Sequence, residues 1–386
     1  MAEASARRVS ERPNPTLGLV PGYNTTTGRS AGISPWIIGL VLDLPIETAG
    51  KREYRTVQAR LLSESARLDV ARTAWDVRRR VREALLGLHH TVQVERNLQK
   101  EWQLYTSKVE FLGHWYDTGE ISGMELAQAR IELAQSRNAW LKAGREKSRD
   151  LALLAQALGL PQEALKGIQF SFDAFESAPP AGFPALVIQR QALLNRADLL
   201  AVLAEYQASQ YALQQEIARQ YPDIQIGPGY EFDQSDNKWT LGFSVALPLF
   251  NRNQGAINVA EASREEVAAR FQSVQADILA QISQSFVQYQ VSIERLNRAD
   301  ELAREMEAQV KRVEKTIQLG EGLDLDRINK ELEYNALLAS RLEDLITVQQ
   351  AISRIEDSMQ TASDLPGGER GLGQVMNRRQ EGSADE

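Results

Sequence analysis

Few side chains in this 386-residue chain could do chemistry. It has no cysteine, and its three histidines are His89, His90 and His114. The lack of cysteine excludes disulfides, thiolate metal sites and cysteine nucleophiles. His89 and His90 are neighbours in a segment predicted to be helical, where adjacent side chains point about 100° apart, so they make a poor chelating pair. We therefore predict packed or solvated histidines and no metal site.

Other patterns that could carry a reaction are equally weak. The Gly227-Pro-Gly229 turn is followed by neither a lysine nor a helix, unlike a phosphate-binding loop. No Ser-His-Asp or paired-carboxylate arrangement stands out, and acids scattered along helices are usually solvated. The net charge of −8 provides no basic surface for nucleic acid. We expect no enzymatic activity, no cofactor and no nucleic-acid partner.

The dominant feature is an internal repeat. Residues 16–23 (TLGLVPGY) match residues 223–230 (DIQIGPGY) at an offset of 207. Further matches at offsets of 203 and 201 pair Trp36 with Trp239, Pro45 with Pro248, and Gly119 with Gly320. An offset that drifts slowly over about 100 residues indicates duplication with small deletions.

Each copy begins with two short segments in which apolar residues alternate with small or polar ones, which predicts β-hairpins over 16–47 and 223–250. Strands of about ten residues with aromatic residues near their ends fit a lipid-facing barrel. An antiparallel sheet packed on a soluble core is the commoner meaning of such alternation. For the lipid-facing alternative, the predicted aromatic anchors are Tyr23, Trp36, Tyr230 and Trp239.

A very long helix follows each hairpin. No proline occurs between Pro45 and Pro161 or between Pro248 and Pro366, and apolar residues recur with a mean spacing of about 3.6. This predicts helices over 50–117 and 252–319, each about 100 Å long. Both end at glycine turns and return as half-length helices over 124–158 and 325–359, with Ser122 and Asp324 as candidate caps.

The remaining segments complete the domain organisation. We predict a disordered N-terminus (1–12), repeat 1 (13–158), a belt containing short β-like runs (159–183), repeat 2 (184–360) and a disordered tail (361–386). Repeat 2 opens with a helix over 184–221. A complete repeat 1 would have a matching helix, and an exported protein a signal peptide, before Thr16. We expect neither here, which would leave three gaps in a trimeric tube.

Four strands require partners if they meet lipid. Open sheet edges are not tolerated in hydrocarbon, and the smallest membrane barrels have eight strands. Three copies would supply twelve. The predicted fold is therefore mainly α-helical with membrane β-structure: a shared trimeric 12-stranded barrel, continued by an α-helical barrel with two repeats per chain.

In the order of its predicted elements the chain resembles the TolC-like outer-membrane efflux proteins over residues 13–360. Segments that agree are the helix start at 196–199 (RADL), Tyr221-Pro222, and 247–250 (LPLF) at the second long helix. The glycine turns with an acid six positions on, Glu125 and Asp326, also agree. The stretch 227–255 is most similar to the heavy-metal branch, which serves cobalt–zinc–cadmium and copper–silver pumps.

The resemblance implies a homotrimer in outer-membrane lipid that extends into the periplasm. It would be the passive exit duct of a tripartite system with a periplasmic adaptor (membrane fusion protein) and an inner-membrane pump of the resistance-nodulation-division type. The implied cargo is heavy-metal cations. The alternatives are a duct for drugs or type I protein secretion, and a soluble coiled-coil scaffold.

The resemblance also implies site residues. The implied adaptor-docking tips are Thr118, Gly119, Glu120, Ile121 and Ser122, with Leu319, Gly320, Glu321 and Gly322. The implied periplasmic gate comprises Asp326, Glu125 and Asp324, and the alternative is that Asp324 and Asp326 are simple helix-start charges. Three positions depart from the family pattern. Ile317 stands where an aromatic can occur, Gly322 where a basic residue can occur, and Asn329 where a second acid is common. We therefore expect a looser or differently latched gate.

Overall fold

The computed structural model describes residues 1–25, 35–176, 185–233 and 236–360. The chain forms two compact units, Met1–Val70 with Ala197–Ala276, and Ala71–Arg196 with Asp277–Glu386. The prediction of a mainly helical chain with four strands is confirmed.

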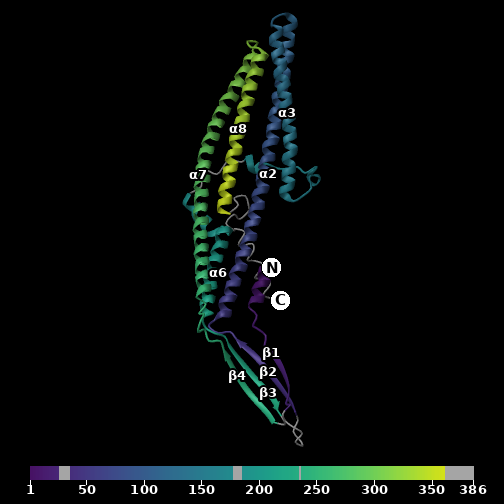
Figure 1. The fold of residues 1–386 in the computed structure, drawn as a ribbon. Coiled ribbons are helices and arrows are strands. Elements are labelled where there is room, and N and C mark those ends of the chain that lie inside the picture. The colour runs from purple at the N-terminus through teal and green to yellow at the C-terminus, as the bar shows by residue number, and fades with distance from the viewer. Residues whose placement is uncertain (26–34, 177–184, 234–235, 361–386) are drawn as a thin grey trace, which may run out of the picture. The chain divides into compact units, whose positions relative to one another are not determined.

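The strands of the first unit form one antiparallel sheet in the order β1-β2-β3-β4 (Figure 1). They are β1 (Thr16–Tyr23), β2 (Trp36–Ile46), β3 (Ile224–Asp233) and β4 (Asp236–Val245). Each hairpin pairs within itself, and β2 joins β3 across more than 170 residues of chain, with Leu40 opposite Tyr230.

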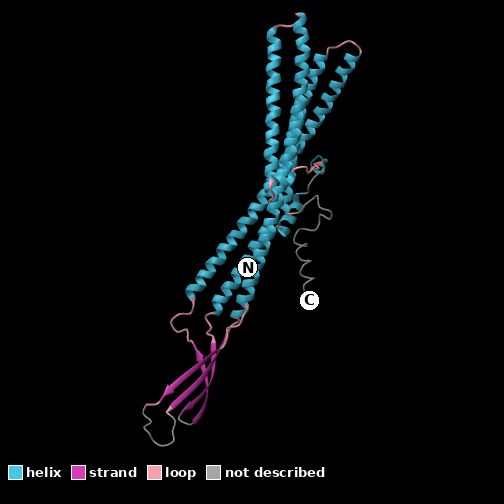
Figure 2. Cartoon of the chain, turned by 90° about the vertical axis from the view of Figure 1, so that its right-hand side faces the viewer, coloured by secondary structure: helices cyan, strands magenta, loops and turns pink. Residues whose placement is uncertain are grey.

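Two helices of unusual length follow the hairpins. They are α2 (Lys51–Thr118), with 68 residues, and α7 (Gln254–Gln318), with 65. The absence of proline keeps both unbroken. In the second unit they turn back through short loops into α3 (Gly123–Leu158) and α8 (Asp324–Met359), as Figure 2 shows. Among the described helices, none is long and apolar enough to cross a membrane.

The single helix predicted over 184–221 is two helices. These are α5 (Ala185–Asn195) and α6 (Ala197–Ala218), separated at Arg196. The Asp198 carboxylate accepts the backbone N–H of Leu199 at 2.9 Å, a local bond typical of a helix start. Periodicity alone did not predict this break, because strong helix formers lie on either side of it, but α6 begins within the 196–199 segment (RADL) that resembles a helix start.

The prediction that residues 1–12 are disordered is wrong. Residues Ala2–Val9 form helix α1. Its residues AEASARRV include good helix formers, with Glu3 in the first turn and Arg7 and Arg8 in the last, which suits the helix dipole. Hydrogen bonds from α2 then hold the C-terminal end of α1, which no local sequence pattern reveals.

The predicted belt holds no strand among its described residues, 159–176, so the expected β-like runs are wrong. It contains a short 3₁₀ turn, η1 (Gln162–Leu165), and α4 (Asp173–Glu176). Its apolar residues pack on helices instead: Leu165 joins Leu88 and Leu154, and Phe175 joins Leu86 and Ile346. The predicted tail, 361–386, lies outside the described residues.

Candidate functional site

One face of the sheet is apolar, and many of its side chains are exposed in the described chain. Successive side chains of a strand point to opposite faces, and the register places the apolar set of all four strands together. Leu17 is 71% exposed, Phe243 67% and Trp239 81%. We name this surface the apolar sheet face. It comprises Leu17, Leu19, Pro21 and Tyr23 of β1; Trp36, Ile38, Leu40, Leu42, Leu44 and Ile46 of β2; Ile224, Ile226, Pro228, Tyr230 and Phe232 of β3; and Trp239, Leu241, Phe243 and Val245 of β4.

The four predicted aromatic anchors form two cross-strand pairs on this face. Tyr23 lies opposite Trp36 with ring centroids 5.1 Å apart, and Tyr230 lies opposite Trp239 with centroids 4.9 Å apart. The Tyr23–Trp36 pair is the last pair of its hairpin, at the end remote from the long helices, and the Tyr230–Trp239 pair lies in the corresponding half of the second hairpin. Tyrosine and tryptophan favour the boundary between lipid and water, because each combines an apolar ring with a polar group.

The opposite face of the sheet is built mainly of small and charged residues, with Val20, Ile37 and Val41 as its apolar members. In the described strands it carries the acids Asp43, Glu231, Asp233 and Asp236 but one cation, Lys238. The Nζ of Lys238 lies 2.5 Å from Asp233 and 3.8 Å from Glu231. This face is polar and carries a net negative charge.

Neither edge of the sheet has a partner strand among the residues that the structure describes. The outer strands are β1 and β4, and every residue of β4 is exposed. Because neighbouring strands alternate in direction, β1 and β4 run opposite ways. The free edge of β4 in one copy could therefore pair in an antiparallel manner with β1 of another.

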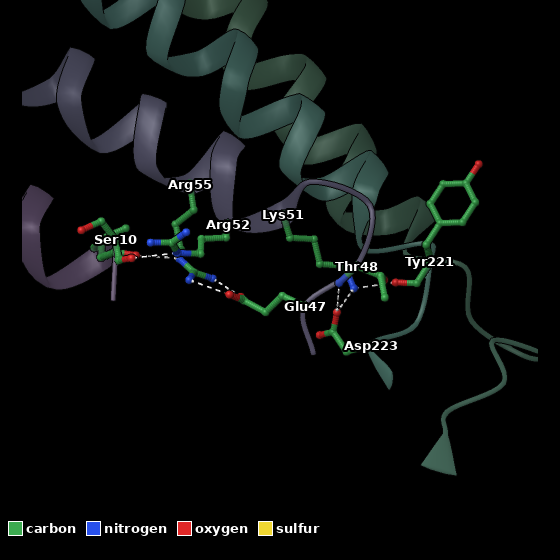
Figure 3. Close-up of polar contacts among 9 residues, drawn as sticks. Ser10, Glu47, Thr48, Lys51, Arg52, Arg55, Tyr221 and Asp223 are labelled. Atoms are coloured by element: carbon green, nitrogen blue, oxygen red, sulfur yellow. Dashed lines mark hydrogen bonds and ion pairs between the residues drawn. The ribbon is translucent and has the colours of Figure 1, made fainter. Parts of the chain in front are cut away.

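A hydrogen-bonded junction joins the sheet to the long helix α2 in the first unit (Figure 3). The buried Lys51 donates to Asp223 Oδ1 at 2.7 Å and to the Tyr221 carbonyl at 2.5 Å. Thr48 adds its N–H to Asp223 Oδ1 at 3.0 Å and its hydroxyl to the Pro222 carbonyl at 2.6 Å. The segment that connects α6 to β3 is thus hydrogen-bonded to the start of α2.

Partial burial acts to raise the pKa of Asp223. The hydrogen bonds from Lys51 and Thr48, with the charge of Lys51, outweigh it and hold the pKa of Asp223 below its ordinary value. The junction therefore keeps this carboxylate ionised.

A second set of bonds at the junction involves arginines of α2 (Figure 3). Arg55 pairs with Glu47 through both guanidinium nitrogens, at 2.5 and 3.2 Å. The Nε of Arg52 donates to Ser10 O at 2.9 Å, and that of Arg55 to Val9 O at 3.0 Å. These last bonds position α1 against the start of α2.

Sequence reasoning missed this junction. Lys51 and Asp223 are separated by 172 positions, and no sequence motif links the two residues. The nearest signal is positional, since Lys51 opens a long helix and Asp223 immediately precedes a strand.

The tips of the two helix hairpins lie in the second unit. At the first tip Ser122 caps α3, as predicted. Its hydroxyl accepts the Glu125 N–H at 3.3 Å, and its own N–H donates to the Glu125 carboxylate at 2.8 Å. Gly119 and Gly320 adopt the left-handed conformation that helix ends favour, with φ of 82° and 81°. The predicted gate residue Glu125 is therefore held by the cap of its own helix.

At the second tip the predicted capping role of Asp324 is wrong. The N-cap position of α8 is Leu323, which makes no side-chain cap bond. Asp324 is the first helical residue, and its Oδ1 accepts from Arg327 Nε at 3.3 Å. Asp324 and Asp326 are both exposed. The turn places the start of the helix one residue earlier than a cap at Asp324 would require.

An apolar contact brings the second tip against the first helix pair. Leu325 of α8 and Ile121 of the first tip both pack on the cluster of Leu112, Leu126 and Ala129. The structure thus joins the two predicted tip regions through a leucine, next to the predicted gate acid Asp326.

The two adjacent histidines have separate partners. His89 is 1% exposed, lies against Phe172 and Phe175, and has its Nε2 3.4 Å from Glu176. Burial is the main cause that lowers the pKa of His89. His90 lies 2.9 Å from Glu343 instead. No group of three or more metal-ligating side chains occurs in the part of the chain that the structure describes.

A buried acid that the sequence did not reveal anchors the C-terminal end of α8. The Glu356 side chain is fully buried, 3.3 Å from Arg82 and 3.5 Å from Arg78 of α2. Arg82 also donates to Ser353 at 2.7 Å. Removing either partner of such a pair would leave a buried charge uncompensated.

Comparison with known proteins gives these features a context. The chain matches the family model described as outer membrane efflux protein over residues 1–160 and 188–363. It is 27% identical over 278 residues to the cobalt-zinc-cadmium resistance protein CzcC of Cupriavidus metallidurans, covering 69% of this chain and 62% of that protein. The chain therefore spans less than two-thirds of the length of this relative.

Solved structures with a similar fold include the outer-membrane channel OprN, with a TM-score of 0.73 and 17% identity over 93% of this chain and 84% of that one. CusC gives a TM-score of 0.71 and 16% identity, covering 93% and 86%. VceC of Vibrio cholerae gives 0.70 and 17%, covering 93% and 90%. At these identities the likeness concerns the fold.

Proposed function

This chain belongs to the outer membrane efflux protein family, and we propose that three copies of it form the passive outer-membrane exit duct of a tripartite system that exports heavy-metal cations. The family and the similar solved structures are channel proteins and not enzymes. The observation that carries the proposal is the exposed apolar sheet face, together with the two edges of its sheet, which have no partner strand in the described part of the chain.

The exposed face argues for lipid as its surroundings. Large contiguous apolar patches on a protein surface mark contact with a membrane or a partner. Here the patch follows all four strands and carries paired aromatic residues in the half remote from the long helices, as in a membrane barrel. A soluble scaffold would have to hide this face, and no described helix covers it.

The sheet edges argue for assembly. Backbone groups in hydrocarbon must be paired, so a four-stranded open sheet cannot stand alone there. An even number of antiparallel strands lets identical copies join β4 to β1 around a ring. Three copies make twelve strands, with the small and charged face lining the lumen.

The long helices would continue this barrel into the periplasm. Helices of 68 and 65 residues measure about 100 Å at 1.5 Å per residue. We propose that their tips, 118–123 and 319–323, receive a periplasmic adaptor coupled to an inner-membrane pump. The tips are mostly exposed, which leaves them free for such contacts.

Two observations support heavy-metal cations as the cargo. The relative CzcC is named for cobalt, zinc and cadmium resistance. The proposed luminal face has four acids and one lysine in the described strands, a balance that attracts cations into a narrow pore. A passive exit needs no metal-binding cluster of its own.

The proposal is tested in two steps. The protein is extracted from membranes in detergent, its mass is measured, and its single-channel conductance is recorded in planar bilayers. A soluble monomer without conductance would exclude the duct. Deleting the gene should then lower tolerance to zinc, cobalt, cadmium, copper or silver, and unchanged tolerance to all five would argue against metal export while leaving the duct intact.

A further inference from the structure

The residues after β4 behave differently from their repeat equivalents. The offset of 203 places residues 246–249 on 43–46. Residues 43–46 belong to β2, whereas 246–249 belong to no strand. Leu247 is 71% exposed, while its equivalent Leu44 is partly buried. The same position in the repeat therefore has two conformations in one chain.

The cause is a missing neighbour. In the first copy Leu44 lies opposite Ile226 and Ile46 opposite Ile224, so β3 of the same chain holds these residues in the sheet. Residues 246–249 follow an edge strand, beside which the described chain supplies no partner. Local sequence cannot explain the difference, because 247–249 (LPL) and 44–46 (LPI) are nearly identical.

The repeat also predicts which residues a partner would align. The offset of 207 makes Ile226 the repeat equivalent of Leu19, and the offset of 203 makes Phe243 the equivalent of Leu40. Leu19 pairs with Leu40 in the first hairpin, and Ile226 pairs with Phe243 in the second, so the repeat preserves this register. The same offsets can be applied to the β2–β3 pairing. Leu40 pairs with Tyr230 in that interface. The repeat equivalents of these residues are Phe243 and Tyr23, so Phe243 of one copy is expected to lie opposite Tyr23 of the next.

We propose that β1 of a second copy pairs with β4 in this register, with Val20 opposite Ala246 and Leu19 opposite Leu247, and that this pairing extends β4 through Leu249. The inference rests on the proposed trimer and specifies its interface. It turns an exposed, irregular segment into a strand that neither copy can complete alone.

The side-chain pattern agrees with this register. Leu247 and Leu249 would lie opposite Leu19 and Leu17, all on the apolar sheet face. A slip of one residue would bring apolar and small or charged faces together, which a half-buried sheet does not tolerate. A slip of two residues keeps the faces, so an experiment must separate these two registers.

Cysteine pairs can make this distinction, because the chain has no native cysteine. Directly opposed residues have Cα atoms about 4.5–5.5 Å apart, within the 4.4–6.8 Å that a disulfide spans, while a slip of two residues adds about 6.6 Å along the strand. The test variant is Val20→Cys with Ala246→Cys. The matched control is Gly18→Cys with Ala246→Cys, and Gly18 has room for a Cβ, with its nearest neighbour 3.7 Å away.

Crosslinks within one chain are excluded by distance. β1 and β4 are three strand spacings apart, about 14 Å in the sheet. After mild oxidation of the detergent-solubilised protein, we expect Val20→Cys/Ala246→Cys to run as a covalent trimer on denaturing gels. Reduction should return it to monomer. The control should stay at least tenfold less crosslinked.

The outcomes separate the register from the assembly. A trimer by native mass that crosslinks better through Gly18→Cys, or through neither pair, would overturn the proposed register and leave the duct standing. A monomer by native mass would overturn the proposed function and this inference with it. As a second measurement, the backbone amides of Leu247 and Leu249 should exchange hydrogen at least tenfold more slowly in the trimer than in monomer dissociated by detergent. Equal rates would overturn the strand extension.

Discussion

Replacing Lys51 by methionine tests whether the junction between sheet and helix depends on one buried cation. Lys51 Nζ donates to Tyr221 O and Asp223 Oδ1, and its side chain is 9% exposed. Methionine keeps the apolar stem but removes the charge and all donors. Breaking a buried pair costs about 3–5 kcal/mol, and an exposed pair is worth about 0–1 kcal/mol. Because Asp223 remains 46% exposed and water can solvate it, we expect a loss of about 2 kcal/mol, between these limits.

The assay is hydrogen exchange at the backbone amide of Thr48, which donates to Asp223 Oδ1 at 3.0 Å. A loss of about 2 kcal/mol corresponds to exchange about 30-fold faster, since each 1.4 kcal/mol is about tenfold. Arg52→Met is the matched control, because Arg52 is the adjacent cation but is exposed and donates only to Ser10 O in the described contacts. We expect less than a threefold change there. If both variants change exchange at Thr48 equally, the argument from burial is wrong.

Three further predictions concern the second unit. Burial raises the pKa of Asp357 from 3.8 to about 6, so the stability that its protonation provides is complete below pH 3.8 and is lost as the pH rises through 6. Asp357→Asn should therefore raise the thermal midpoint at pH 7 and leave it unchanged near pH 3.5; equal effects at both pH values would contradict this. Glu356→Gln should cost about 3 kcal/mol in urea unfolding, because it leaves Arg82 without its buried counter-charge, and a change below about 0.5 kcal/mol would count against the buried pair. Leu325→Ser should lengthen channel open times in planar bilayers, because it weakens the apolar contact between the tips. Leu323→Ser, at an exposed position, should leave open times unchanged. Identical open times in the two variants would show that this contact does not hold the channel closed.

The long helices were predictable because their signal is local. Two proline-free stretches with a spacing of about 3.6 placed α2 and α7 within two residues of their observed ends. The alternation of strand residues likewise predicted which side chains share the apolar sheet face. The Ser122 cap followed from residue type and its position after a glycine turn.

The parts that sequence reasoning missed depend on contacts between distant residues. Helix α1 is held by Arg52 and Arg55, which lie more than 40 positions away. The pairs Lys51–Asp223 and Arg82–Glu356 also join distant segments, and their burial is a property of the packed structure. At Asp324 a local signal was misleading. Aspartate is a common N-cap residue, but Asp324 is the first residue of α8, and Leu323 occupies the N-cap position.

The two free edges of the sheet also govern how the protein must mature. In the proposed trimer, the sheet edges of each chain are paired only by other copies. The last step of folding is therefore an association of chains, and its rate depends on their concentration. Until that association, each chain presents an open edge and an uncovered apolar face, the features that promote aggregation. A cell that makes few copies would then hold most of them as unfinished intermediates, and the yield of working channels would rise more steeply than the amount of protein synthesised.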